Sequence, residues 1–68
     1  MIEKLKKLYG KRVRVVTNDN YVIVGKFSVY QRPGDNEYEC DTICIEDGPN
    51  SLIEIKVNEI KEIELSTQ

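Results

Sequence analysis

Few side chains in this sequence are of the types that carry out enzyme chemistry. The chain has no histidine, and it offers no adjacent nucleophile and base, so general acid–base and nucleophilic catalysis lack their usual residues. It also has no glycine-rich loop of the kind that binds phosphate. We therefore expect a protein that is not an enzyme and that uses no cofactor.

Metal binding has two sets of candidate ligands. Four acidic residues alternate along one stretch, namely Asp35, Glu37, Glu39 and Asp41. Their oxygens suit a hard cation, yet the same spacing by two is typical of a solvated strand face. Cys40 and Cys44 are the only cysteines. On one strand their Cα atoms would lie about 13 Å apart, too far for a disulfide. A zinc site needs two further soft ligands, so we expect two reduced, structural thiols and no metal unless subunits share one.

The formal net charge of −2 hides an uneven distribution. The first fourteen residues contain six basic and one acidic residue, whereas the remainder contains four basic and eleven acidic residues. Basic side chains can meet phosphates, and flat groups can stack on bases. The candidate residues for nucleic acid are Lys4, Lys7, Lys11, Arg12, Arg14, Tyr30, Arg32 and Lys56. The alternatives are a solvated basic helix face and a tyrosine that caps the end of a barrel.

These residues must be positioned by a short helix and a series of strands. Apolar residues at helical spacing, from Ile2 to Tyr9, predict a helix that Gly10 ends. The pattern then alternates from residue 11 to 17, and Asn18-Asp19-Asn20 predicts a turn. Later segments predict strands over 21–30, 38–47, 51–57 and 60–65, separated by Pro-Gly and Asn-rich turns.

The second of these strands has the most informative pattern. Its expected inward face carries Tyr21, Ile23, Gly25, Phe27 and Val29, whereas Tyr30 falls on the opposite face. A glycine inside a strand indicates a sharp bend or the close approach of another backbone. Ile43 and Ile45 are the expected core residues of the next strand.

The sequence thus predicts a mostly β fold in a single domain over residues 1–68: a small, strongly bent, five-stranded antiparallel barrel with a short N-terminal helix. Closure is expected because an open sheet would leave two exposed edges. No apolar run is long enough to span a bilayer and no signal-peptide pattern is present. We therefore expect a cytoplasmic protein with no membrane partner.

The order and residues of these segments resemble the Sm/LSm family over nearly the whole chain. The matching stretches are Leu8-Tyr9-Gly10-Lys11, Val13-Arg14-Val15, Val24-Gly25-Lys26-Phe27 and Ile55-Lys56-Val57-Asn58-Glu59-Ile60. Two motifs depart from the family pattern. Gln31 and Asp35 stand where the family commonly has Asp and Asn, with Asn36 one step later; Lys56 and Val57 stand at the Arg-Gly pair.

The resemblance implies a ring-type homo-oligomer, in which the fourth strand of one copy pairs with the fifth strand of the next. It also implies binding of RNA or single-stranded nucleic acid, with Asn36 added to the candidate residues. Charged residues along the two strands could instead keep the chain monomeric. The alternative function is a structural or protein-interaction barrel of the same fold, with a peptide-reading SH3-like or Tudor-like barrel as a more distant option.

Overall fold

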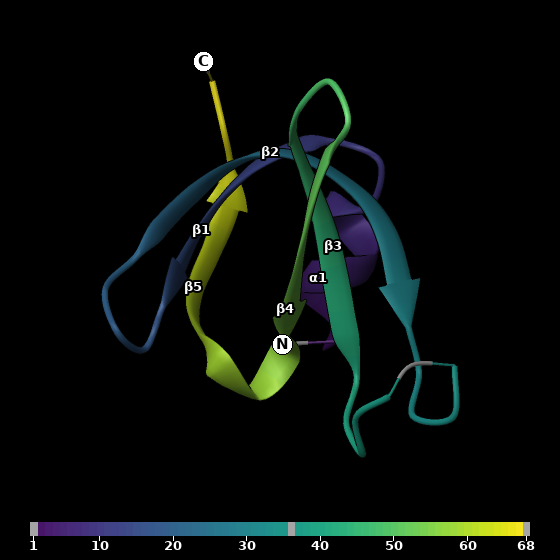
Figure 1. The fold of residues 1–68 in the computed structure, drawn as a ribbon. Coiled ribbons are helices and arrows are strands. Elements are labelled where there is room, and N and C mark those ends of the chain that lie inside the picture. Colours follow the sequence, from purple (N-terminus) through teal and green to yellow (C-terminus); the bar gives the residue numbers. More distant parts are fainter. Residues whose placement is uncertain (1, 36, 68) are drawn as a thin grey trace.

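The computed structural model describes residues 2–35 and 37–67, which form a short N-terminal helix and a strongly curved antiparallel sheet (Figure 1). The elements are α1 (Ile2–Leu8), β1 (Arg12–Thr17), β2 (Val22–Gln31), β3 (Thr42–Gly48), β4 (Ser51–Lys56), the 3-10 helix η1 (Val57–Glu59) and β5 (Ile60–Leu65). The predicted mostly β class, the helix and the five antiparallel strands are therefore confirmed. None of the helices in this described part of the chain combines the length and the apolarity needed to cross a bilayer.

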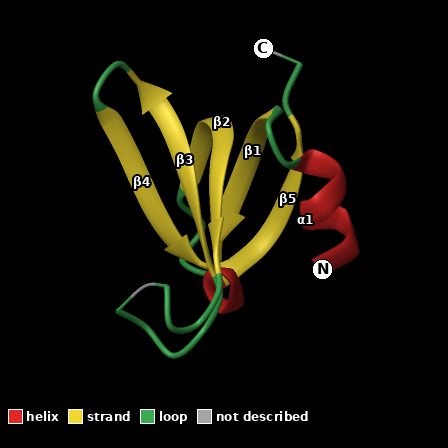
Figure 2. Ribbon diagram, turned by 90° about the vertical axis from the view of Figure 1, so that its right-hand side faces the viewer, coloured by secondary structure: helices red, strands yellow, loops and turns green. Residues whose placement is uncertain are grey.

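The sheet is open, so the prediction of a closed barrel is wrong. Its strand order is β4-β3-β2-β1-β5, which places β4 and β5 at the two edges without pairing between them. The chain passes from β4 through η1 into β5, and the two strands lie farther apart with increasing distance from η1 (Figure 2). The strong curvature that the sequence indicated is nevertheless present.

Gly25 lies where β2 passes closest to β3. A Cβ atom at this position would lie 2.2 Å from the backbone oxygen of Glu46 and 2.8 Å from its carbonyl carbon. The first half of β2 pairs with β1 and the second half pairs with β3, and the strand arches over the molecule between them (Figure 1). The predicted close approach of another backbone is confirmed, and only glycine fits there.

An irregularity in β2 changes which side chains point inward. The register with β3 shifts between Phe27 and Val29, so that Tyr30 lies opposite the buried Ile43 and packs against the core. Simple alternation, which does not include such a bulge, put Tyr30 on the outer face. Tyr21 was expected to be inward, but it is 71% exposed because it precedes β2 at the end of the turn.

The core fills the concave side of the sheet, and α1 packs onto it through Leu5 and Leu8. The helix ends at Leu8, and the predicted stop residue Gly10 follows in the turn with a φ of 82° that suits glycine. The Gly10 N–H donates a hydrogen bond to the Phe27 carbonyl at 2.8 Å, which joins the end of the helix to β2. The buried cluster comprises Leu5, Leu8, Val13, Val15, Phe27, Ile43, Ile45, Ile55, Ile60 and Ile63.

Candidate functional site

The basic residues predicted to bind nucleic acid are divided between two faces. Lys4 and Lys7 are exposed on α1, which packs on the concave side. Arg12 and Arg14 alternate with the buried Val13 and therefore point from β1 to the convex side. Lys11 is exposed between the two elements. The sheet thus separates residues that are close in sequence.

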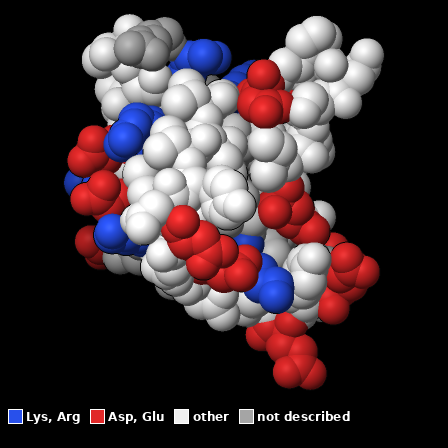
Figure 3. Space-filling model, turned by 60° about the vertical axis from the view of Figure 1, so that its left-hand side comes forward, with Lys and Arg blue, Asp and Glu red and all other residues white. Residues whose placement is uncertain are grey.

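The convex side carries charges of both signs. Arg14 lies opposite Glu64 of the neighbouring β5, while Arg12 lies opposite Lys26 of β2. Figure 3 shows acidic and basic side chains interspersed over this part of the molecule rather than one continuous basic field. A phosphate backbone that approached Arg14 would therefore also meet a carboxylate.

A second group of predicted residues does come together, at the end of β2. Tyr30 and Arg32 line a cavity of about 320 Å³ with Asp41 from the loop before β3 and with Ile2 and Lys6 from α1. The cavity is therefore lined by two cationic side chains, one carboxylate and a tyrosine. Lys6 was not among the residues predicted from the sequence, because only the docked helix brings it beside β2. We call this set the Lys6–Tyr30–Arg32 cluster.

The hydroxyl of Tyr30 donates a short hydrogen bond to the Asp41 carboxylate. This bond, then burial and the negative charge of Asp41, raise the pKa of Tyr30 above its ordinary value, and nearby Arg32 opposes the shift. Tyr30 is therefore a fixed, protonated side chain at neutral pH. It offers the cavity an aromatic surface rather than an ionisable group.

Lys56 lies near the same end of the sheet but has a partner of its own. Its Nζ atom is 4.6 Å from the centre of the Tyr38 ring, a cation–π contact. The Val57 N–H donates to the Asp41 carbonyl at 2.9 Å, which fixes the end of β4 beside the loop that carries Asp41. Asn36, the remaining candidate, lies outside the described residues.

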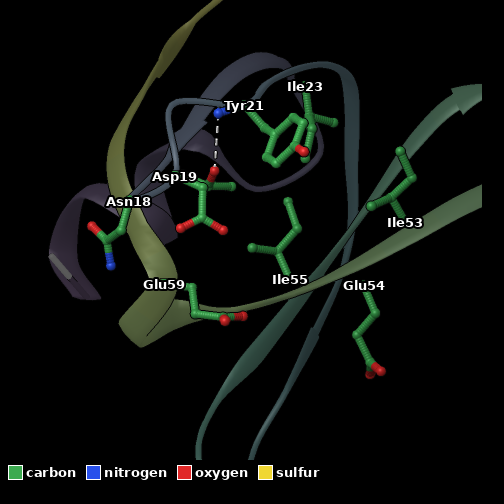
Figure 4. Close-up of a pocket in the computed structure, with 9 residues that line it drawn as sticks. Asn18, Asp19, Tyr21, Ile23, Ile53, Glu54, Ile55 and Glu59 are labelled. Carbon is green, nitrogen blue, oxygen red and sulfur yellow. Dashed lines mark hydrogen bonds between the residues drawn. The ribbon is translucent and has the colours of Figure 1, made fainter.

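A second cavity, of about 400 Å³, lies on the concave side between β4 and the turn that joins β1 to β2. We call it the acidic groove; it is lined by Thr17, Asn18, Asp19, Tyr21, Ile23, Ile53, Glu54, Ile55 and Glu59. Figure 4 shows the Asp19 carboxylate pointing into the space between Tyr21, Ile55 and Glu59, whereas Glu54 points away from it.

Two turns that are distant in sequence build the acidic end of this groove. The Asn18 N–H donates to the Glu59 carbonyl at 2.9 Å, and the Asn18 side-chain amide donates to the Asn58 carbonyl at 3.2 Å. Asp19 and Glu59 are thereby held at one end of the groove. Both segments were predicted only as turns, although each contains an acidic residue that could have indicated a shared site.

The residues considered as metal ligands do not assemble into a site among the described residues. No group of three or more Cys, Asp or Glu side chains that could hold a metal occurs within residues 2–35 and 37–67. Cys40 and Cys44 are both thiols, and Cys40 precedes β3 rather than sharing it. Burial, and then the charge of Glu54, raise the pKa of the Cys44 thiol, which keeps it protonated and unreactive.

The two edges of the sheet are the third notable surface. The outer sides of β4 and β5 have no strand partner within the described chain. Each edge strand also presents a large exposed apolar residue, Leu52 on β4 and Leu65 on β5, both 56% exposed. Unpaired backbone groups beside exposed leucines are suited to pairing with another strand.

The chain matches no family model, no curated protein and no solved structure. The resemblance to the Sm/LSm family therefore stays a prediction, and the function must be argued from the surfaces described above.

Proposed function

We propose that this chain is a small, Sm-like, self-associating module with a binding rather than a catalytic role. The observation that supports this proposal is the pair of unpaired outer strands, β4 and β5, at opposite edges of one curved sheet. The two edges belong to different strands. When β4 of one copy pairs head-to-tail with β5 of the next, the resulting assembly therefore still has a free β5 edge at one end and a free β4 edge at the other. Such pairing continues until the copies close a ring.

Chain length and side-chain charge both favour this pairing. A chain of 68 residues buries only about 60% of its unfolded surface, so association adds stability that one small core lacks. Charges of both signs occur along the edges: Glu54 and Lys56 on β4, and Lys61, Glu62 and Glu64 on β5. Opposite charges across a strand pair are favourable, whereas like charges directly opposite each other are not.

The molecular mass in solution tests the proposal, measured by light scattering over a range of protein concentrations. The wild-type chain should have a mass several times that of one chain, and Leu52→Lys should reduce it because an added charge discourages edge pairing. Val22→Lys is the matched control, since Val22 is 53% exposed but lies on β2, an inner strand. A wild-type monomer at high concentration rejects the proposal. If both variants reduce the mass equally, association depends on exposed apolar surface rather than on the strand edges.

A second candidate function is the binding of single-stranded RNA at the Lys6–Tyr30–Arg32 cluster. The observation that favours it is the convergence of two predicted residues, Tyr30 and Arg32, with an additional lysine around one cavity. The cations can meet phosphate, and the tyrosine can pack against a base. Asp41 accepts the Tyr30 hydrogen bond and holds the ring in place.

Binding of a short single-stranded RNA over a salt series tests this second function. Phosphate contacts predict a linear fall of log affinity with log salt concentration. The double variant Lys6→Glu with Arg32→Glu should remove binding, whereas Arg12→Glu with Arg14→Glu, on the convex side, should have the smaller effect. No binding at low salt would exclude this function. A larger loss in the convex-side variant would move the interface to β1.

A further inference from the structure

The acidic groove differs from the other charged surfaces because its charge is of a single sign. Three of its lining residues are carboxylates, and no lysine or arginine occurs among the described residues that line it. On the convex side, by contrast, Arg14 lies opposite Glu64. The Lys61 ammonium lies outside this lining and donates a hydrogen bond to the Asn20 side-chain oxygen at 3.1 Å.

The floor of the groove is apolar. Ile55 is buried, Ile23 and Ile53 are half-buried, and the exposed Tyr21 ring forms one side (Figure 4). A long side chain with an aliphatic stem and a cationic end fits such a surface, because its stem packs on isoleucine while its charge meets the carboxylates. Lysine and arginine side chains have this form. Nucleic acid does not suit the groove, because the carboxylates would repel its phosphates.

The free edge of β4 borders the same groove, since Ile53, Glu54 and Ile55 belong to that strand. Backbone hydrogen bonds extend in the plane of a sheet, whereas side chains project from its faces. In a copy whose β4 is not paired with β5 of another copy, an extended segment could therefore add to the β4 edge and direct alternate side chains into the groove.

We propose that the acidic groove binds an extended, basic and apolar segment of a partner protein, with one lysine or arginine side chain held between Asp19 and Glu59. Charge complementarity and the apolar floor of the groove support this occupant. The proposal goes beyond self-association and does not depend on it, because the groove also exists in a single chain.

A short peptide that alternates valine with lysine is the probe, with a peptide that alternates valine with glutamate as its control. Titration calorimetry should show binding of the first peptide only, weakened by added salt because the charges are near the surface. Asp19→Asn and Glu59→Gln keep the shape of each side chain and remove its charge. We expect each substitution to weaken binding about threefold, and the double variant about tenfold, which corresponds to about 1.4 kcal/mol.

Glu3→Gln is the matched charge control. Glu3 is exposed on α1, lies on neither edge strand and is not among the residues that line the groove. Its substitution should leave peptide affinity unchanged. If it weakens peptide binding as much as a groove substitution does, the effect comes from net charge alone and the proposal is overturned. Unchanged affinity in the double groove variant would also overturn it.

The oligomeric mass of the same double variant separates this proposal from self-association. If Asp19→Asn with Glu59→Gln dissociates the assembly, the groove is occupied by a second copy of this chain and the proposed partner is wrong. If the variant keeps the wild-type mass and loses only the peptide, the groove serves a separate partner. Failure of the wild-type chain to associate would reject the edge-pairing function and leave peptide binding to be judged on its own result.

Discussion

At Gly25 the backbone of β2 passes so close to β3 that no side chain fits between them. Gly25→Ala would place a methyl group 2.2 Å from the Glu46 backbone oxygen, and a strand in the middle of the sheet cannot move without disturbing its neighbours. We expect a loss of about 1–3 kcal/mol in the free energy of unfolding, measured by urea denaturation. Gly48→Ala is the control, because no atom lies within 4 Å of the added methyl. Equal stability of the two variants would contradict the role of Gly25.

Tyr30 makes a prediction about pH. Its hydrogen bond to Asp41 raises the pKa of the Tyr30 hydroxyl, so folding favours the protonated form. This contribution to stability is fully present below the ordinary tyrosine pKa of about 10, and it is lost as the pH rises through the higher pKa of the folded state.

Ultraviolet absorbance of tyrosinate measures this titration directly. One of the four tyrosines should ionise at a higher pH than it would in an unfolded chain. Tyr30→Phe should remove this ionisation step. Asp41→Ala should move the step to lower pH, because the hydrogen bond is the largest cause of the shift. If the Tyr30→Phe variant still shows a tyrosine that ionises at this higher pH, the raised pKa belongs to another tyrosine.

Residue-level sequence patterns predicted the core well where alternation is regular. Phe27, Ile43 and Ile45 are all fully buried, as expected. The pattern failed at Tyr30 because the bulge after Phe27 changes the face of every later side chain in β2. A bulge depends on how the neighbouring strand is paired, and the sequence of one strand does not reveal it.

At the scale of elements, α1 is the part whose stability depends most on docking. A helix of seven residues is too short to persist alone in water, so its attachment through Leu5 must supply its stability. Leu5→Ala should lower the free energy of unfolding by about 2–5 kcal/mol, because Leu5 is fully buried. Ile2→Ala should cost about 0.5 kcal/mol or less, since Ile2 is 54% exposed. Chemical denaturation of both variants checks this; similar losses would mean that Leu5 is not the main anchor.

The strand boundaries followed from turn chemistry and alternation. The last strand was expected over 60–65 and occupies Ile60–Leu65, while the strand expected over 38–47 begins only at Thr42. Residues 37–41 contain alternating acids that resemble a strand, but Tyr30 and Val57 bind Asp41 from two sides and fix a loop there. Whether the sheet closes was not predictable, because closure depends on the direction in which β5 leaves η1 relative to β4.

For the whole molecule, compactness does not reveal whether the sheet is closed. The Cα radius of gyration is 11.0 Å, which is the value of about 11 Å expected for any folded domain of this length. Small-angle X-ray scattering of the Leu52→Lys variant should therefore give a radius close to that of a single chain. The wild-type protein should give a clearly larger radius if the edges pair. Equal radii at high concentration would contradict edge pairing.

The candidate site was predicted in part. Tyr30 and Arg32 were selected from their place before the Pro-Gly loop, and the structure groups them in one cavity. Lys6 joins the cavity of Tyr30 and Arg32, and Asp19 and Glu59 line one groove, only through tertiary contacts between segments more than twenty residues apart. Local patterns carry no information about such pairs.

The position of β1 between β2 and β5 has a consequence for biosynthesis. Val13 and Val15 are made early, yet their second neighbour strand is made more than forty residues later. At ribosomal rates of about 5–20 residues per second, one side of β1 stays uncovered for about 2–10 seconds. Final closure of the core must therefore wait until Ile60–Leu65 has left the ribosome.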